Sequence, residues 1–205
     1  MLRRSMRVLS MLFILASPWV LYVTLSQDRI DIAAATLIGW VILRSLPTLI
    51  AVKREHLAAA LRLPAIALVF ALLGWIFDRG WMLLILPSAS QTAFGATFLR
   101  SLRKTPLVEH FARMVKPELS PAELAHCRSW TFVWGVYLIL IAIVGLFFAR
   151  FASLRAWTLY TGVVCYGLIG LLFAVEYTIR KIRFRDYGKN PVDWLISRLF
   201  PGAPC

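Results

Sequence analysis

Residues 130–149 read WTFVWGVYLILIAIVGLFFA, a run of twenty residues without a charged side chain. A helix of about 20 apolar residues crosses the ~30 Å hydrocarbon layer of a bilayer, because each residue adds ~1.5 Å. Similar runs recur along the 205-residue chain, which is 60% hydrophobic. Soluble domains contain only about 45–50% apolar residues. The sequence therefore predicts an all-α protein that crosses a membrane several times.

Six runs have the length and composition of a span, and together they predict a single membrane domain. Their approximate limits are 8–26, 30–52, 63–77, 81–99, 130–149 and 156–179. Residues 53–62, before the shortest run, indicate a basic loop. The first run is too long for the apolar core of a signal peptide and lacks a small-residue cleavage site, so we expect it to be retained.

Lysine and arginine residues predict the orientation of this six-helix bundle. In the six-span arrangement, 18 of the 23 Lys and Arg residues lie on the side of the two termini, four lie on the other side, and Arg44 lies within a span. Cytoplasmic loops are enriched in these residues. We therefore expect both termini, the loop 100–129 and the tail 180–205 to be cytoplasmic. Topology accounts for the net charge of +13, and no nucleic-acid partner is predicted.

Two short cytoplasmic helices are predicted to lie in the membrane interface. Residues 106–116 place apolar side chains at helical spacing between charged ones, and Glu109 can pair with Arg113 four residues on. Ser120-Pro121-Ala122-Glu123 is a helix-start sequence, so the helix of the fifth span should begin near Ser120. A second start at Asn190-Pro191 predicts a short helix in the tail.

Two charged residues are predicted at membrane depth. Arg44 lies in the cytoplasmic half of the second span, and Glu176 lies at a similar depth in the sixth. A charge at the bilayer centre costs at least about 2.5–3.5 kcal/mol, so such residues snorkel to the interface or find a partner. Arg44 can do either, and Glu176 can pair with Arg44 or with Arg180, four residues further along its own helix.

The fourth span carries polar residues and a proline near its middle. Ser88, Gln91 and Thr92 could line a substrate cavity, as broken helices do in transporters. The alternative is close helix packing through small residues, with the hydroxyl groups bonded back to the backbone. Small side chains recur here at intervals of four residues, which favours packing.

His110, His126, Cys127 and Glu109 are the residues that could support acid–base or nucleophilic chemistry near the cytoplasmic side. They have no triad order, no metal-ligand spacing and no glycine-rich phosphate loop around them. No catalytic residue, metal or cofactor is predicted from them. We expect the histidines to be solvated or interfacial.

The basic residues around the last two spans are the candidate binding groups. Each one near the membrane surface contributes roughly 1 kcal/mol of attraction to anionic lipid, and together they also attract acidic soluble proteins. The set comprises Arg100, Arg103, Lys104, Arg113, Lys116, Arg128, Arg180 and Arg183.

The second half of the chain resembles a family of small bacterial inner-membrane proteins. The resemblance lies in residues 105–113 (TPLVEHFAR), Leu119-Ser120-Pro121, and Arg128 with Thr131 and Trp134, and it continues in Glu176-Tyr177, Arg180 and Arg183-Phe184. It covers about residues 90–185. Genes of that family typically accompany acyl carrier proteins and ketosynthases, as in aryl-polyene pathways. The resemblance implies location in the bacterial inner membrane and possible acyl-carrier-protein or pathway-enzyme partners, and it implies no activity.

Three functions are compatible with the sequence. The first is a non-enzymatic membrane component of a lipid or polyketide-like pathway that docks acidic partners at its basic cytoplasmic face. The second is a small transporter or flippase for a lipidic product, which needs a polar cavity reaching mid-membrane. The third is an integral-membrane acyltransferase-type enzyme, which needs an acid, base or nucleophile gathered near the cytoplasmic surface.

Overall fold

The structure is a computed structural model that describes residues 16–51, 54–185 and 191–199. It is 87% helix, and the described residues form no strand. The prediction of an all-α fold is confirmed. The first helical segment covers residues 16–26, and ten further elements follow it: α2 (Ile30–Ala51), α3 (Arg54–Ile76), α4 (Gly80–Leu84), α5 (Leu86–Ser101), α6 (Leu107–Val115), α7 (Pro121–Phe151), α8 (Leu154–Leu159), η1 (Tyr160–Val164), α9 (Cys165–Phe184) and α10 (Pro191–Leu199).

Three helices of the described part are long and apolar enough to cross a membrane. They are Gly80–Ser101, which joins α4 to α5, then α7, and Leu154–Phe184, which joins α8, η1 and α9. They contain the predicted fourth, fifth and sixth runs. The elements α2 and α3 contain shorter apolar segments, Ile30–Ile42 and Pro64–Ile76.

The predicted basic loop 53–62 is wrong for most of its length, because α3 already begins at Arg54. Residues 57–60 read LAAA, and alanine and leucine have the highest helix propensities. Pro64 therefore lies inside α3, where its ring removes one backbone hydrogen bond without ending the helix.

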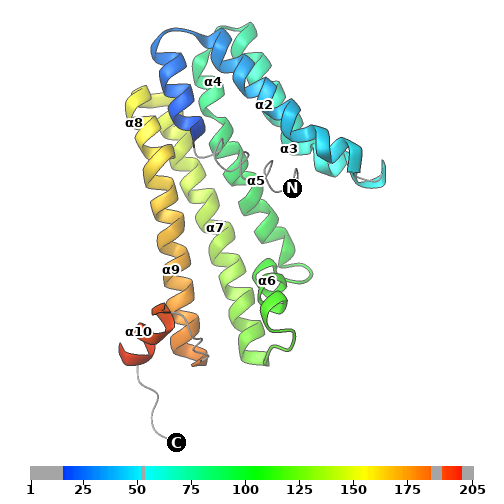
Figure 1. Ribbon diagram of the computed structural model, residues 1–205, viewed down its shortest axis with the longest axis vertical. Coiled ribbons are helices and arrows are strands. Elements are labelled where there is room, and N and C mark those ends of the chain that lie inside the picture. The colour runs from blue at the N-terminus through cyan, green and yellow to red at the C-terminus, as the bar shows by residue number, and fades with distance from the viewer. Residues whose placement is uncertain (1–15, 52–53, 186–190, 200–205) are drawn as a thin grey trace, which may run out of the picture.

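The hairpin of α2 and α3 projects to one side of the bundle, and the other described helices are connected at two ends of the molecule (Figure 1). One end, which we call the turn end, holds the turns at residues 27–29, 77–79 and 152–153. The other end, which we call the basic end, holds α6, the start of α7, the end of α9, and α10. Arg29, Arg79, Arg150 and Arg155 belong to the turn end, whereas the predicted basic binding residues belong to the basic end.

Two turns at the turn end have the same local structure. Asp28 and Asp78 adopt positive φ angles of 58° and 49°. The following residue then donates a backbone hydrogen bond back over five residues, from Arg29 to Thr24 (3.0 Å) and from Arg79 to Gly74 (2.9 Å). This pattern satisfies carbonyl groups at a helix C-terminus, and aspartate tolerates the left-handed conformation better than most residues do. Each Asp-Arg pair therefore ends one helix and starts the next.

Close contact between α5 and α7 joins the two halves of the chain. A Cβ atom added at Gly95 would lie 2.8 Å from the carbonyl oxygen of Gly135, and one added at Gly135 would lie 2.6 Å from Leu99. Further along the same pair of helices, Ser88 lies against Gly145. Glycine lets helix backbones approach closely, which is how apolar helices gain contact in a membrane.

We expect Gly95→Ala to destabilise the protein by about 1–3 kcal/mol, since the added methyl group meets a backbone atom that cannot move aside. The melting temperature in detergent micelles should fall by about 2–4 °C per kcal/mol. Gly170→Ala is the matched control, because a Cβ atom at Gly170 meets nothing within 4 Å. Equal melting temperatures for the two variants would contradict the close crossing.

Candidate functional site

The helix α6 is held on α7 by buried groups at the basic end. Val108 and Ala112 face α7, and the backbone N–H of Val108 donates to Thr131 Oγ1 at 3.2 Å. Thr131 in turn donates to the carbonyl oxygen of Cys127 at 2.7 Å. Ser101 Oγ accepts from the N–H of Leu107 at 3.0 Å, which satisfies a free donor at the start of α6. The helix is therefore fixed at both its start and its inner face.

The apolar residues predicted to lie in the membrane interface divide between two faces of α6. Val108 packs against α7, while Phe111, Met114 and Val115 are 54%, 70% and 88% exposed. The predicted pair between Glu109 and Arg113 is confirmed at 2.8 Å. An exposed apolar edge beside charged residues is typical of a helix at a bilayer surface.

The predicted helix start at Ser120 is confirmed, and α7 begins at Pro121. Ser120 and Glu123 form a reciprocal capping box, in which the carboxylate accepts from the N–H of Ser120 at 2.7 Å. Lys116 also donates to Glu123, at 2.9 Å. The α6–α7 connection is thus fixed by a buried carboxylate that receives both a backbone and a side-chain donor.

Trp134 of α7 contacts both α5 and α9. It is 4% exposed, and its indole N–H donates to a carboxylate oxygen of Glu176 on α9. Its ring lies 6.2 Å from that of Phe98 on α5 and 4.4 Å from that of Phe173 on α9. We call Trp134, Glu176, Phe98 and Phe173 the tryptophan cluster. It gives the acid at membrane depth a hydrogen-bond donor from a neighbouring helix.

Two tyrosines make further bonds between α7 and the last long helix. Tyr137 donates to the carbonyl oxygen of Leu168 at 2.9 Å, and Tyr160 donates to that of Ile141 at 2.7 Å. Tyr160 starts the π-helical turn η1, where the wider winding frees carbonyl groups from the regular helical pattern. Aromatic side chains with polar tips thus connect these helices along their length.

The predicted pair of Arg44 and Glu176 stays a prediction, because the side chain of Arg44 lies outside the described residues. Glu176 has Trp134 as a partner, which the sequence analysis did not name. The sequence carries only a weak signal for this pair. A tryptophan and a glutamate on different spans can be placed at the same depth only when the limits of both spans are known.

The polar residues of the predicted fourth span are arranged for packing. Ser88 is 1% exposed and lies against Gly145, with its hydroxyl oxygen unpartnered. Thr92 donates back to the carbonyl oxygen of Ser88 at 2.9 Å. Gln91 is half-buried on the same helix. The contact of Ser88 with Gly145 and the bond of Thr92 to its own helix backbone favour close helix packing over a substrate cavity.

The potential acid–base residues differ in their exposure. His110 is exposed on α6, as predicted. The prediction of a solvated or interfacial histidine is wrong for His126, which is buried in α7 together with Cys127. The ring of His126 lies 5.3 Å from Phe184 and 5.9 Å from Trp130, so its neighbours are aromatic. Within the described residues, no three His, Cys, Asp or Glu side chains are grouped to hold a metal ion.

The predicted basic residues differ in their partners. Arg113 and Lys116 pair with Glu109 and Glu123. Among the described residues, no ion pair includes the other members of the loop group, which are all exposed: Arg100, Arg103, Lys104 and Arg128. On α9, Arg180 is half-buried and Arg183 exposed. The charges available to a partner therefore lie chiefly between α5 and α6 and on the exposed face of α7.

The predicted tail helix is present as α10, and it contacts α9 through a fully buried carboxylate. Asp193 is 0% exposed and accepts from Tyr177 and, at 2.9 Å, from Lys181. The sequence analysis did not predict a contact among these three residues. The four-residue spacing of Tyr177 and Lys181, which places them on one helix face, was the one signal in the sequence.

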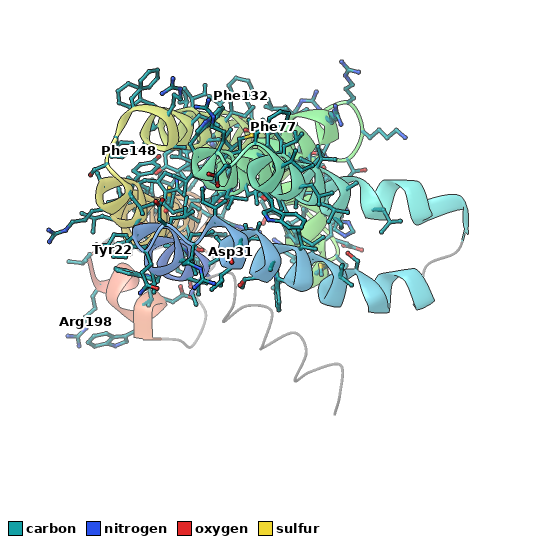
Figure 2. All side chains as sticks on the ribbon, turned by 90° about the horizontal axis from the view of Figure 1, so that it is seen from above. Tyr22, Asp31, Phe77, Phe132, Phe148 and Arg198 are labelled. Atoms are coloured by element: carbon teal, nitrogen blue, oxygen red, sulfur yellow. The ribbon has the colours of Figure 1, made fainter. Side chains whose placement is uncertain are left out.

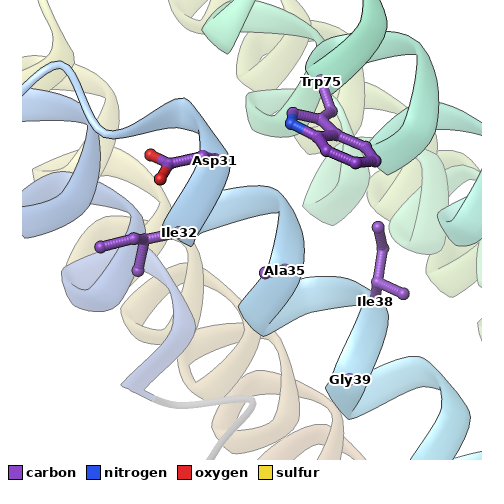
Figure 3. Close-up of a pocket in the computed structure, with 6 residues that line it drawn as sticks. All are labelled: Asp31, Ile32, Ala35, Ile38, Gly39 and Trp75. Atoms are coloured by element: carbon purple, nitrogen blue, oxygen red, sulfur yellow. The ribbon is translucent and has the colours of Figure 1, made fainter.

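A groove of about 520 Å³ lies between α2 and α3, and no residue of the tryptophan cluster lines it (Figure 3). Trp75 of α3 faces Ile38 of α2 across it, and its lining is mostly apolar. Asp31 lies at its rim and pairs with Arg29 at 3.1 Å. An open apolar groove of this kind fits a lipid-facing surface better than a catalytic cleft.

Comparison with known protein families, with curated proteins and with solved structures finds no match to this chain.

We expect Trp134→Phe to destabilise the protein by about 1–3 kcal/mol, because it leaves the partly buried Glu176 carboxylate without its donor. Glu176→Gln retains an acceptor oxygen and should cost less. Thermal unfolding in micelles measures both. Phe132→Leu is the control, since Phe132 is 55% exposed on the same helix and surface substitutions stay within about 0.5 kcal/mol. A loss no larger for Trp134→Phe than for Phe132→Leu would show that the bond contributes nothing.

Proposed function

We propose that the chain is a six-span protein of the bacterial inner membrane with both termini in the cytoplasm. Three long apolar helices, the shorter apolar segments of α2 and α3, and the predicted first run support the six spans. The positions of the arginines support the orientation: the turn end has few, and the basic end has many.

Single cysteines on a background with Cys127, Cys165 and Cys205 replaced by serine test this topology. In intact cells, a membrane-impermeant maleimide should label Ser153→Cys at the turn end and should not label Thr105→Cys at the basic end. After lysis the reagent should label both cysteines, which is the control that each one can react. Labelling of Thr105→Cys in intact cells would reverse the orientation.

We propose that the basic end docks an acidic soluble protein at the membrane, without catalysing a reaction. The observation that carries this proposal is the group of exposed cations without ion pairs among the described residues, Arg100, Arg103, Lys104 and Arg128. Topology alone accounts for cations on this side. The helix α6 beside them is bonded to Ser101 of α5 at its start and to Thr131 of α7 by a buried bond, and it adds a defined shape to the charge.

An acyl carrier protein is the partner that we propose, in a lipid or polyketide-like biosynthetic pathway. Its support is the resemblance in residues 90–185 together with the charge of the surface. Anionic lipid binds the same cations, so the bilayer itself competes for them. Clusters of like charge act mainly on encounter rate and orientation, which suits a transient partner.

We expect Arg100→Ala, Arg103→Ala and Lys104→Ala together to weaken binding of a holo acyl carrier protein in a pull-down at low salt by tenfold or more. The control variant, Arg79→Ala with Arg150→Ala and Arg155→Ala, removes the same charge from the turn end and should bind normally. Raising the salt concentration should weaken wild-type binding, because screening acts on exposed charges. Unchanged capture by the basic-end variant would refute the docking proposal.

A further inference from the structure

The groove between α2 and α3 begins at the turn end and continues along α2. Its described lining consists of Asp31, Ile32, Ala35, Ile38 and Gly39 of α2 and Trp75 of α3. Asp31 and Gly39 lie at opposite ends of the α2 lining in Figure 3, and their separation of eight residues corresponds to about 12 Å of helix. Seen from the turn end, α2 leads away from Asp31 beside α3 (Figure 2). The groove therefore has one charged end and one long apolar section.

The apolar section of the groove is open. Ile32 and Trp75 are 40% and 55% exposed, and Ala35 is exposed as well. A Cβ atom added at Gly39 would meet nothing within 4 Å, so the end of the groove away from Asp31 is open too. The volume of about 520 Å³ lies within the ~300–1,000 Å³ of typical small-molecule sites, which are mostly apolar and contain few polar groups. This section has the length and the chemistry to hold an apolar chain.

The charged end of the groove carries a cation and an anion side by side. Arg29 donates through Nε and Nη2 to the two carboxylate oxygens of Asp31, at 3.2 and 3.1 Å. The guanidinium group has five N–H donors, so three of them remain after these two bonds. The side chains of Arg29 and Asp31 are 53% and 57% exposed, so both charges are accessible to a ligand.

The depth of the groove indicates the class of its ligand. In the six-span arrangement proposed above, the turn end lies at the lipid headgroups and α2 continues from there into the hydrocarbon layer. An ethanolamine headgroup carries a phosphate anion and an ammonium cation close together, which complement Arg29 and Asp31. Its ammonium group donates hydrogen bonds to a carboxylate, whereas choline has no N–H group to donate. A glycerol headgroup has no cation for Asp31.

We infer that this groove binds a phospholipid with an ethanolamine headgroup, with the phosphate at Arg29, the ammonium group at Asp31 and one acyl chain along α2 toward Gly39. The inference rests on the membrane position of α2 in the proposed function. It is independent of the docking of an acidic protein, because the groove lies at the turn end and the docking surface at the basic end.

Native mass spectrometry of the full-length protein in detergent tests the site, with ethanolamine, choline and glycerol phospholipids of identical acyl chains added in equal amounts. Wild type should retain the ethanolamine lipid about tenfold better than the glycerol lipid, because Asp31 bonds only to the ammonium group. Gly39→Phe fills the groove and should lower retention of the ethanolamine lipid by about tenfold. Gly170→Phe is the matched control, since a Cβ atom at Gly170 also meets nothing within 4 Å. Ala35→Leu is the second variant if the melting temperature of Gly39→Phe in lipid-free detergent differs from that of wild type.

Two further variants test the headgroup contacts. Asp31→Asn removes the anion and keeps the side-chain shape, so its retention of the ethanolamine lipid should fall to that of the choline lipid. Arg29→Gln should weaken retention of all three lipids, because each has a phosphate group.

Three outcomes would overturn the inference: undiminished retention of the ethanolamine lipid by Gly39→Phe and Ala35→Leu, equal retention of all three lipids by wild type, or a dimer of wild type that Gly39→Phe abolishes. The last outcome would assign the groove to a second copy of the chain. A failure of the proposed orientation is seen separately, as labelling of Thr105→Cys in intact cells, and the lipid measurements in detergent do not depend on it.

Discussion

The approach of two backbones at Gly95 and Gly135 is the constraint on which the arrangement of the bundle depends. At this crossing the helices leave no room for a Cβ atom, so α5 and α7 have one distance and one rotation relative to each other. That rotation turns Ser101 toward the start of α6 and Thr131 toward Val108. It also brings Phe98 beside Trp134. The crossing therefore positions α6 and its neighbouring cations.

A second constraint, the tryptophan cluster, explains how an acid is accommodated at this depth. An isolated carboxylate in an apolar environment is costly, and a donor from a neighbouring side chain offsets part of that cost. Trp134 is suited to this role because its ring contacts Phe173 while its N–H reaches Glu176, one turn further along α9. The same side chain therefore provides both the apolar and the polar contact between α7 and α9. A role in transport does not follow from an acid that is already bonded within the bundle.

Local features of the structure were predictable from the sequence, and contacts between distant residues were not. The capping box at Ser120 and the pair of Glu109 with Arg113 are confirmed, because residues three or four apart in a helix meet whatever the rest of the chain does. The contacts of Trp134 with Glu176 and of Asp193 with Lys181 depend on how whole helices rotate, which spacing does not determine. Residues 54–62 are helical despite their charged residues, because the alanines among them have high helix propensity. The Asp-Arg pair occurs twice, at residues 28–29 and 78–79, and this repeat predicts two similar turns, since Asp28 and Asp78 end helices in the same way.

The two short helices at the basic end are attached in different ways, and this difference bears on function. The bonds that hold α6 join uncharged groups, and the one to Thr131 is buried. A charged group from another molecule does not compete for bonds of this kind. Arg113 of α6 and Lys116, which follows the helix, are already paired with carboxylates. The described contact of α10 with α9 is ionic, because the buried Asp193 carboxylate accepts from Lys181 and Tyr177. Of these two attachments, the ionic one is therefore the one that a loss of charge at its partners would weaken.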